Sequence, residues 1–138
     1  MIERVLIFFD QKEMARQDLH KKFYFLGVLM QNLLKHRYKG KKLRFVNIHL
    51  RSSEFYLQYN EEGNTGFFNG KDITFDGVID FEVLESLGLN EQKLMIWRIL
   101  CDHLLDIGKT VGSSFVNAIN QVKADGLKLN LNADFKAV

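Results

Sequence analysis

Acidic side chains are concentrated in the second half of the chain, where they could act in pairs. Eight Asp or Glu residues lie between positions 61 and 91, against one basic residue, Lys71. Paired carboxylates can serve as general acid and base. Carboxylates beside turns and at helix starts also interact favourably with the backbone dipoles. We therefore interpret this segment as a binding surface and expect no catalytic residues and no enzyme.

Phenylalanines accompany these carboxylates. Charge attracts a basic partner over a long range, and aromatic rings anchor it once it has docked. The partner-binding residues predicted on this basis are Asp72, Asp76, Asp80, Glu82, Glu85, Phe67 and Phe68. We expect a protein-binding module whose partner, for example a toxin domain, carries a basic site.

A basic run supports an alternative function. Six of the ten residues from 35 to 44 are basic, namely Lys35, Arg37, Lys39, Lys41, Lys42 and Arg44. Such a run could contact the phosphates of a nucleic acid. The sequence contains no motif for reading bases, and the same cations suit the last turn of a helix. Nucleic-acid binding through this run is therefore the second hypothesis.

Three other patterns resemble chemical sites but lack the required partners. The Gly108-Lys109-Thr110 triplet resembles the end of a phosphate-binding loop, but the earlier glycine of that motif is replaced by His103. None of the four histidines has a neighbour at zinc-ligand spacing. The single Cys101 lies in an apolar run and is interpreted as a core residue. We expect neither a metal nor a cofactor.

Composition indicates an ordinary globular domain. The chain has 138 residues, of which 46% are hydrophobic and 26% charged, which argues against disordered and disulfide-rich classes. The longest apolar run, residues 23–30, is too short to span a membrane, and the first residues lack the features of a signal peptide. We expect one cytoplasmic domain over residues 1–138.

Charge differs between the two halves of the chain. Residues 1–60 carry twelve Lys or Arg against five Asp or Glu, whereas residues 61–138 carry seven against twelve, so the halves have charges of +7 and −5. The net charge of +2 hides this difference. A dipolar surface steers the approach of charged partners.

The spacing of apolar residues predicts the elements in the first half. Residues 2–9 indicate a buried strand, and Asp10 then caps a helix over residues 12–38 that ends before Gly40. The inward face of this helix carries Leu19, Phe23, Leu26, Met30, Leu33 and Leu34. Residues 43–51 and 54–60 alternate between apolar and polar, which predicts an antiparallel pair of strands.

The second half is predicted to continue with strands 66–68, 72–75 and 77–80, joined by turns at Asn69–Gly70 and Asp76–Gly77. Helices follow over residues 81–87, over 91–107 between an Asn90 cap and Gly108, and over about 111–122. A turn at Asp125–Gly126 leads into a last strand, 127–132. The order β-α-β-β-β(β)-α-α-β predicts a single α+β domain with a mainly antiparallel sheet covered by helices.

A small α+β domain with an acidic, aromatic surface is similar in size and character to bacterial immunity proteins, which inhibit a cognate toxin. The similarity is one of type and includes no shared motif. We therefore expect an inhibitor or immunity protein. A third hypothesis is a small enzyme or ligand-binding domain with a pocket between the sheet and the helix carrying Trp97. A homodimer is compatible with all three, because the helix over 12–38 is apolar on both sides.

Overall fold

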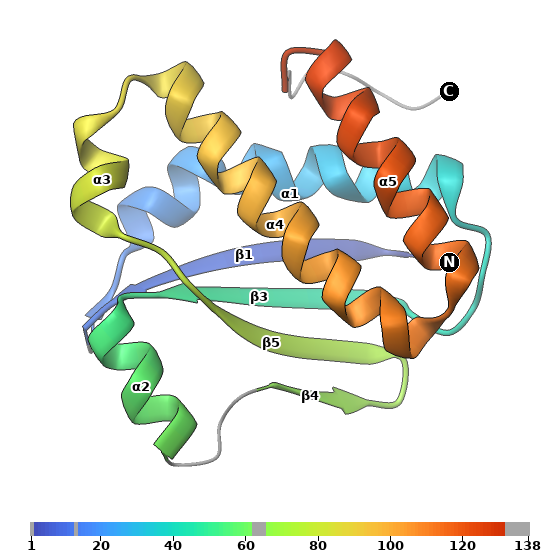
Figure 1. Ribbon diagram of the computed structural model, residues 1–138, viewed down its shortest axis with the longest axis horizontal. Coiled ribbons are helices and arrows are strands. Elements are labelled where there is room, and N and C mark those ends of the chain that lie inside the picture. Colours follow the sequence, from blue (N-terminus) through green and yellow to red (C-terminus); the bar gives the residue numbers. More distant parts are fainter. Residues whose placement is uncertain (1, 13, 62–65, 132–138) are drawn as a thin grey trace.

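The computed structural model describes residues 2–12, 14–61 and 66–131, which form a sheet flanked by helices (Figure 1). The elements, in chain order, are β1 (Arg4–Gln11), β2 (Met14–Ala15), α1 (Gln17–Arg37), β3 (Phe45–Arg51), α2 (Ser53–Glu61), β4 (Gly66–Asn69), β5 (Asp72–Val78), α3 (Phe81–Ser86), α4 (Leu89–Val111) and α5 (Ser113–Lys128). The fold therefore combines α-helices with a β-sheet, as the sequence predicts.

The sheet is mixed, and its centre is parallel. Its strand order is β2-β1-β3-β5-β4, with β1, β3 and β5 parallel. Only the short edge strands β2 and β4 are antiparallel to their neighbours. The prediction of a mainly antiparallel sheet is therefore wrong. Parallel neighbours require a long crossover connection, which α1 supplies between β1 and β3.

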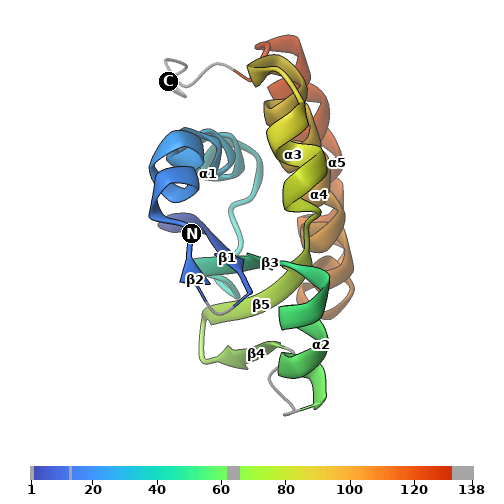
Figure 2. The same ribbon diagram turned by 90° about the vertical axis from the view of Figure 1, so that its left-hand side faces the viewer.

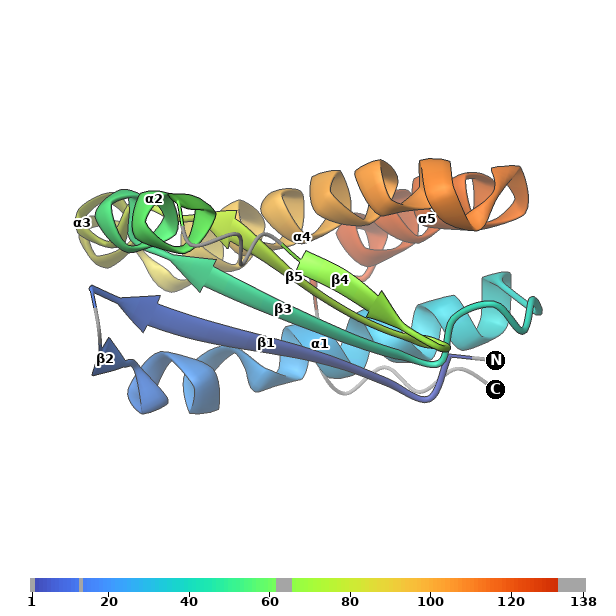
Figure 3. The same ribbon diagram turned by 90° about the horizontal axis from the view of Figure 1, so that it is seen from below.

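Helices cover one face of the sheet. Helix α4 crosses this face, α1 lies along β1, and α5 packs on α1 and α4 (Figures 2 and 3). Phe75 of β5 contacts His103 of α4, with 5.6 Å between ring centroids, and its neighbour in register, Ile48, is buried. On the opposite face Asn47 and His49 are only half buried. In the described part of the chain, no helix lies over β3 on that face (Figure 3), and α1 reaches the face only at the β1 edge, where His20 stacks on Phe8.

Helix α1 closes the outer edge of β1. The Val5 N–H donates to Gln31 Oε1 at 3.3 Å, and the Ile7 carbonyl oxygen lies 2.7 Å from His20 Nδ1. A Cβ atom added at Gly27 would lie 2.5 Å from the Val5 carbonyl oxygen, so glycine is required for this approach. A strand edge covered in this way cannot pair with another chain.

The helical layer contains the core that the sequence predicts. The six residues predicted for the inward face of α1 are all buried, and α1 packs on β1, α4 and α5 of the same chain. Trp97 of α4 is fully buried against Gly126, and its indole N–H donates to the Lys123 carbonyl oxygen at 3.3 Å. The indole has no exposed surface, so no open pocket adjoins it, and ligand binding between the sheet and this helix stays a prediction. Burial raises the pKa of Cys101 to about 12, which makes its thiol unreactive.

Residues 54–60, predicted as a strand, form α2 instead. The alternating pattern placed Phe55 and Leu57 on one face, but Leu57 is 61% exposed. The Phe55 ring contacts the guanidinium of Arg51, with 5.0 Å from its central carbon to the ring centroid. Because β3 and β5 are parallel, the chain between them must cross over, and α2 is part of that crossover.

The predicted last strand, 127–132, is wrong over its described part. Helix α5 continues to Lys128, and residues 129–131 form turns. Leu131 is buried in the core and Leu129 packs against it, whereas Leu127 is 44% exposed, so the helical layer covers two of the three alternating leucines. Asn132 lies outside the described residues.

One predicted turn is confirmed and another is wrong. Gly70, with φ of 62°, turns the chain between β4 and β5 as predicted. The predicted turn at Asp76–Gly77 lies inside β5, which replaces the predicted strands 72–75 and 77–80. A Cβ atom added at Gly77 would lie 2.2 Å from His103 Nε2. This glycine therefore allows close packing of α4.

Several predicted helix ends are also wrong. Asp10 belongs to β1, and α1 begins at Gln17 without a side-chain cap. Gly88 is the N-cap of α4 in place of Asn90. Gly108 lies inside α4, and Asp125–Gly126 lies inside α5.

Gly27→Ala tests the closed edge of β1. Alanine favours a helix over glycine by about 1 kcal/mol, but its methyl group would overlap the Val5 carbonyl oxygen, and overpacking costs about 1–3 kcal/mol. The overlapped atom belongs to the backbone, so the cost lies in the upper part of this range. After subtracting the helix-propensity gain, we expect the free energy of unfolding in urea to fall by about 1–2 kcal/mol. Lys21→Ala, at an exposed α1 position, should change it by less than about 0.5 kcal/mol. Equal or greater stability of Gly27→Ala would contradict the packing described.

Burial lowers the pKa of His103, although Asp106 and Asp102 oppose the shift. Below about pH 6.5, the ordinary histidine pKa, the unfolded chain binds a proton that the folded chain does not. The free energy of unfolding therefore falls as the pH drops, by at most about 1.4 kcal/mol per unit for this group. We expect His103→Leu to remove this component of the pH dependence in urea titrations, and exposed His36→Gln to retain it. If the free energy of unfolding depended on pH identically in the wild type, His103→Leu and His36→Gln, this assignment to His103 would be contradicted.

Candidate functional site

The carboxyl ends of β1, β3 and β5 meet at one edge of the sheet, on the left in Figure 1. In open parallel sheets, ligands usually bind in the crevice outside these ends. A cleft of about 390 Å³ lies here, lined by residues 11–12, 52–54 and 78–82. The cleft is therefore lined by the last residues of β1 and β5 and by the residues that follow β1, β3 and β5.

Arg51 joins the three strands at this edge. Its Nη1 lies 2.9 Å from Asp10 Oδ2 of β1, and its Nε lies 3.0 Å from Asp76 Oδ1 of β5. The side chains of Arg51 and Asp76 are only 7% and 6% exposed. Asp10 and Arg51 directly precede segments that line the cleft, and Asp76 lies two residues before the third segment, so these ion pairs hold the cleft walls in position.

Backbone hydrogen bonds support the same walls. The Ser52 N–H donates to the Asp10 carbonyl oxygen at 3.1 Å, and the Ile79 N–H donates to the Arg51 carbonyl oxygen at 2.9 Å. The Lys12 N–H donates to Ser52 Oγ at 3.0 Å. The cleft is thus built on hydrogen-bonded segments.

The cleft is acidic and partly apolar. Carboxylates of Glu54, Asp80 and Glu82 line it together with one ammonium group, that of Lys12. Asp80 also caps α3, since its Oδ1 accepts from the Val83 N–H at 3.1 Å. Val78 in the cleft is 43% exposed. Leu57 and Val83, on the adjoining helices α2 and α3, are also exposed.

A histidine lies beside the Arg51 network on the uncovered face. Nδ1 of His49 is 3.3 Å from Asp10 Oδ2, and its ring stacks on Phe8 at 4.8 Å between centroids. His20 stacks on Phe8 as well, at 5.0 Å. An Asp–His pair can act as a general base toward a hydrogen-bonded hydroxyl or thiol. Within the described residues, no hydroxyl or thiol is hydrogen-bonded to His49.

The structure divides the predicted partner-binding residues. It brings Asp80 and Glu82 together in the cleft, and Glu85 lies exposed on α3, 2.8 Å from Arg16. Asp76 is buried against Arg51. Asp72 lies at the opposite end of β5. Phe67 and Phe68 lie in β4, and their side chains are outside the part that the structure describes.

Sequence reasoning missed Glu54 and Arg51. Both depend on the parallel order of β1, β3 and β5, which brings the chain after β3 to the same edge as Asp80. The sequence holds one signal for α2: Ser53 and Glu54, a pair typical of a helix start, come just after the predicted strand 43–51.

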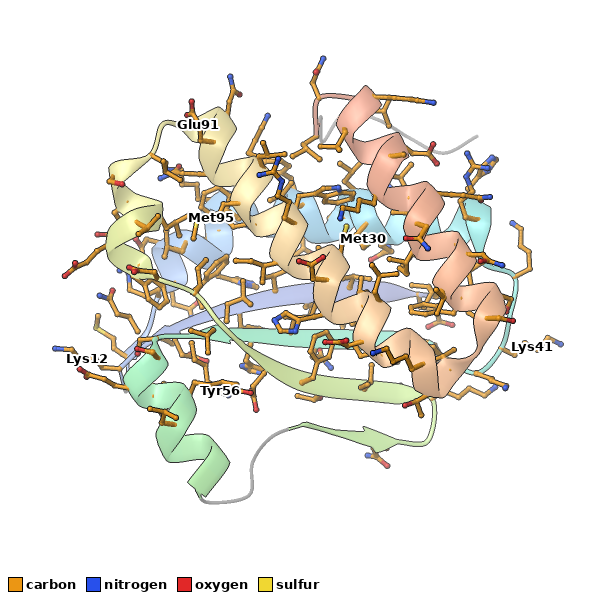
Figure 4. All side chains as sticks on the ribbon, in the orientation of Figure 1. Lys12, Met30, Lys41, Tyr56, Glu91 and Met95 are labelled. Atoms are coloured by element: carbon orange, nitrogen blue, oxygen red, sulfur yellow. The ribbon has the colours of Figure 1, made fainter. Side chains whose placement is uncertain are left out.

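The predicted basic run lies at the other end of the sheet. Lys41 is at the opposite end from Lys12, which lines the cleft (Figure 4). Several of the run's cations have partners within the chain. Arg37 pairs with Asp125 at 2.9 Å, Lys39 donates to the Lys35 carbonyl oxygen at 2.8 Å, and Lys42 donates to that of Val111 at 3.3 Å.

Comparison of the chain with protein-family models, with curated proteins and with solved structures gave no significant match. In the described ranges, no three or more His, Cys, Asp or Glu side chains are grouped so that they could hold a metal ion. No helix described in the structure has the length and hydropathy needed to cross a bilayer.

Arg51→Met would leave two carboxylates without their guanidinium partner. Breaking a buried pair from one side costs about 3–5 kcal/mol, and we expect a loss of this size in urea unfolding. Asp76→Asn in the same chain should recover part of it, because a neutral amide costs less to bury.

Arg37→Met is the matched control for this prediction. Its pair with Asp125 is more exposed, with side chains 38% and 22% accessible, so its loss should cost at most about 1 kcal/mol. Equal losses in Arg51→Met and Arg37→Met, or no recovery in the double variant, would contradict a central role for Arg51.

Proposed function

We propose that this chain is a protein-binding module that holds a basic side chain of its partner in the cleft at the carboxyl edge of the sheet. The observation that carries this proposal is the combination of three carboxylates with exposed apolar surface in one concave site. Glu54, Asp80 and Glu82 supply the negative charge, and Val78 supplies apolar surface beside them.

The physical properties of the cleft suit protein recognition. Carboxylates attract a cationic partner over a long range and raise the association rate. The exposed side chains of Leu57, Val78 and Val83 can then be covered, and burial of such apolar contacts slows dissociation. Because the walls are tied together by Arg51, little ordering is needed on binding, which reduces its entropic cost.

An inhibitor is the form of this function that we favour. A module that covers a basic site on its partner would block access of any anionic substrate to that site. An immunity protein acting on a basic toxin domain fits this description. The supporting features are the acidic cleft and its apolar surroundings.

Charge reversal tests the cleft. We compare Glu54→Lys/Glu82→Lys with Asp102→Lys/Asp106→Lys, which makes the same change of charge at exposed positions on α4. Tagged proteins are used to capture partners from lysate of the native host at physiological salt after nuclease treatment. We expect the wild type and the α4 variant to retain one stoichiometric protein, and the cleft variant to lose it.

The kinetics of the captured complex give the quantitative result. The association rate constant should fall about tenfold or more in the cleft variant and less in the α4 variant. Retention of the same partner by the cleft variant with an unchanged rate, or no retained protein with the wild type, would refute the proposal.

A further inference from the structure

Two arginines lie against one phenylalanine ring at the amino edge of the sheet. The guanidinium carbons of Arg4 and Arg44 are 5.2 Å and 4.4 Å from the centroid of the Phe45 ring. Arg4 begins β1 and is paired in register with Phe45, which begins β3. A guanidinium stacked on a ring is held in place while its in-plane N–H groups stay available to an anion.

The charges of these arginines are poorly neutralised within the chain. The nearest carboxylate to Arg44 is Asp72, at 3.9 Å, and the two side chains are 47% and 38% exposed. Arg4 is exposed and has no carboxylate partner among the described residues. In contrast, Arg51 is held by two carboxylates at 2.9 and 3.0 Å.

Further cations gather at the same edge. The Arg44 N–H donates to the Lys71 carbonyl oxygen at 2.7 Å, which brings the loops before β3 and β5 together. Lys41, Lys42 and Lys71 are exposed in these loops. Lys41 lies at the end of the sheet farthest from the acidic cleft (Figure 4). The amino edge is therefore a concentrated cationic surface.

We propose that Arg4 and Arg44, ordered on Phe45, bind backbone phosphates of a single-stranded nucleic acid. The bound strand continues over the uncovered sheet face. There Asn47 and Thr74, paired in register, are half buried and offer an amide and a hydroxyl to base edges. This site lies outside the proposed protein-binding cleft and does not depend on it.

The chemistry of this edge favours nucleic acid over other polyanions. A membrane-binding surface combines cations with apolar side chains that enter the lipid. None of the exposed large hydrophobic side chains of the described residues lies at this edge; they are Met14, Tyr24, Leu57, Val78, Val83, Leu89 and Leu127. Among the described residues, no helix protrudes from this sheet face that could enter the groove of a duplex.

Fluorescence anisotropy with a labelled single-stranded RNA of about 16 nucleotides tests the site. The wild type should bind this probe at about 50 mM salt and weaken steeply toward about 200 mM. Arg4→Glu/Arg44→Glu should weaken binding about tenfold or more. It should also lower the slope of log affinity against log salt by about 1.4, or about 0.7 for each lost phosphate contact.

Two variants separate this site from general charge attraction. Lys21→Glu/Lys128→Glu makes the same change of charge at exposed positions on α1 and α5 and should weaken binding less than about threefold. Phe45→Leu keeps an apolar side chain but removes the ring, and should weaken binding about two- to fivefold because the arginines lose their cation–π support. Urea unfolding checks that each variant is folded.

Four results would overturn the inference. They are no binding of RNA by the wild type at low salt, equal weakening by the two charge-reversal variants, equal affinity for a duplex of the same length, and stronger binding to anionic phosphatidylserine vesicles than to RNA. Loss of protein capture in the cleft variants with RNA binding unchanged would leave this inference intact, since the two sites lie at opposite edges.

Discussion

The guanidinium of Arg51, held between Asp10 and Asp76, is the interaction on which the proposed site depends. It lies at the end of the central strand β3 and fixes the ends of β1 and β5 relative to it. Buried ion pairs often add little net stability, because desolvation offsets their attraction, but leaving one charge unpaired is costly. The arrangement therefore favours one register of the three strands. The walls of the cleft follow from that register.

Parallel strand order also explains the charge distribution. When three neighbouring strands run in the same direction, the loops that precede them gather at one edge and the segments that follow them gather at the other. The loops before β3 and β5 carry Lys41, Arg44 and Lys71. The segments after β3 and β5 carry Glu54 and Asp80. The charges of the two edges thus follow from strand direction and not from the two halves of the sequence, because Lys71 lies in the acidic half and Glu54 in the basic half.

Local patterns predicted the helices α1, α4 and α5 and the buried face of α1, because apolar residues at intervals of three and four directly reflect packing on one side. Strand direction could not be predicted, because it depends on contacts between distant segments; the helix α2 and the roles of Arg51 and Glu54 were missed with it. Gly77, Gly108 and Gly126 resembled turn and stop signals. Each instead lies inside an element and allows close approach of His103, Val116 or Trp97.

The central claim is that a protein partner occupies the cleft at the carboxyl edge. Hydrogen–deuterium exchange, measured on the protein alone and in a stoichiometric complex with its captured partner, tests this claim most directly. We predict that binding slows exchange in residues 52–57 and 78–83, which line or border the cleft, and leaves residues 38–44 unchanged. Protection confined to residues 38–44 and 71–72, with none at the cleft, would contradict it.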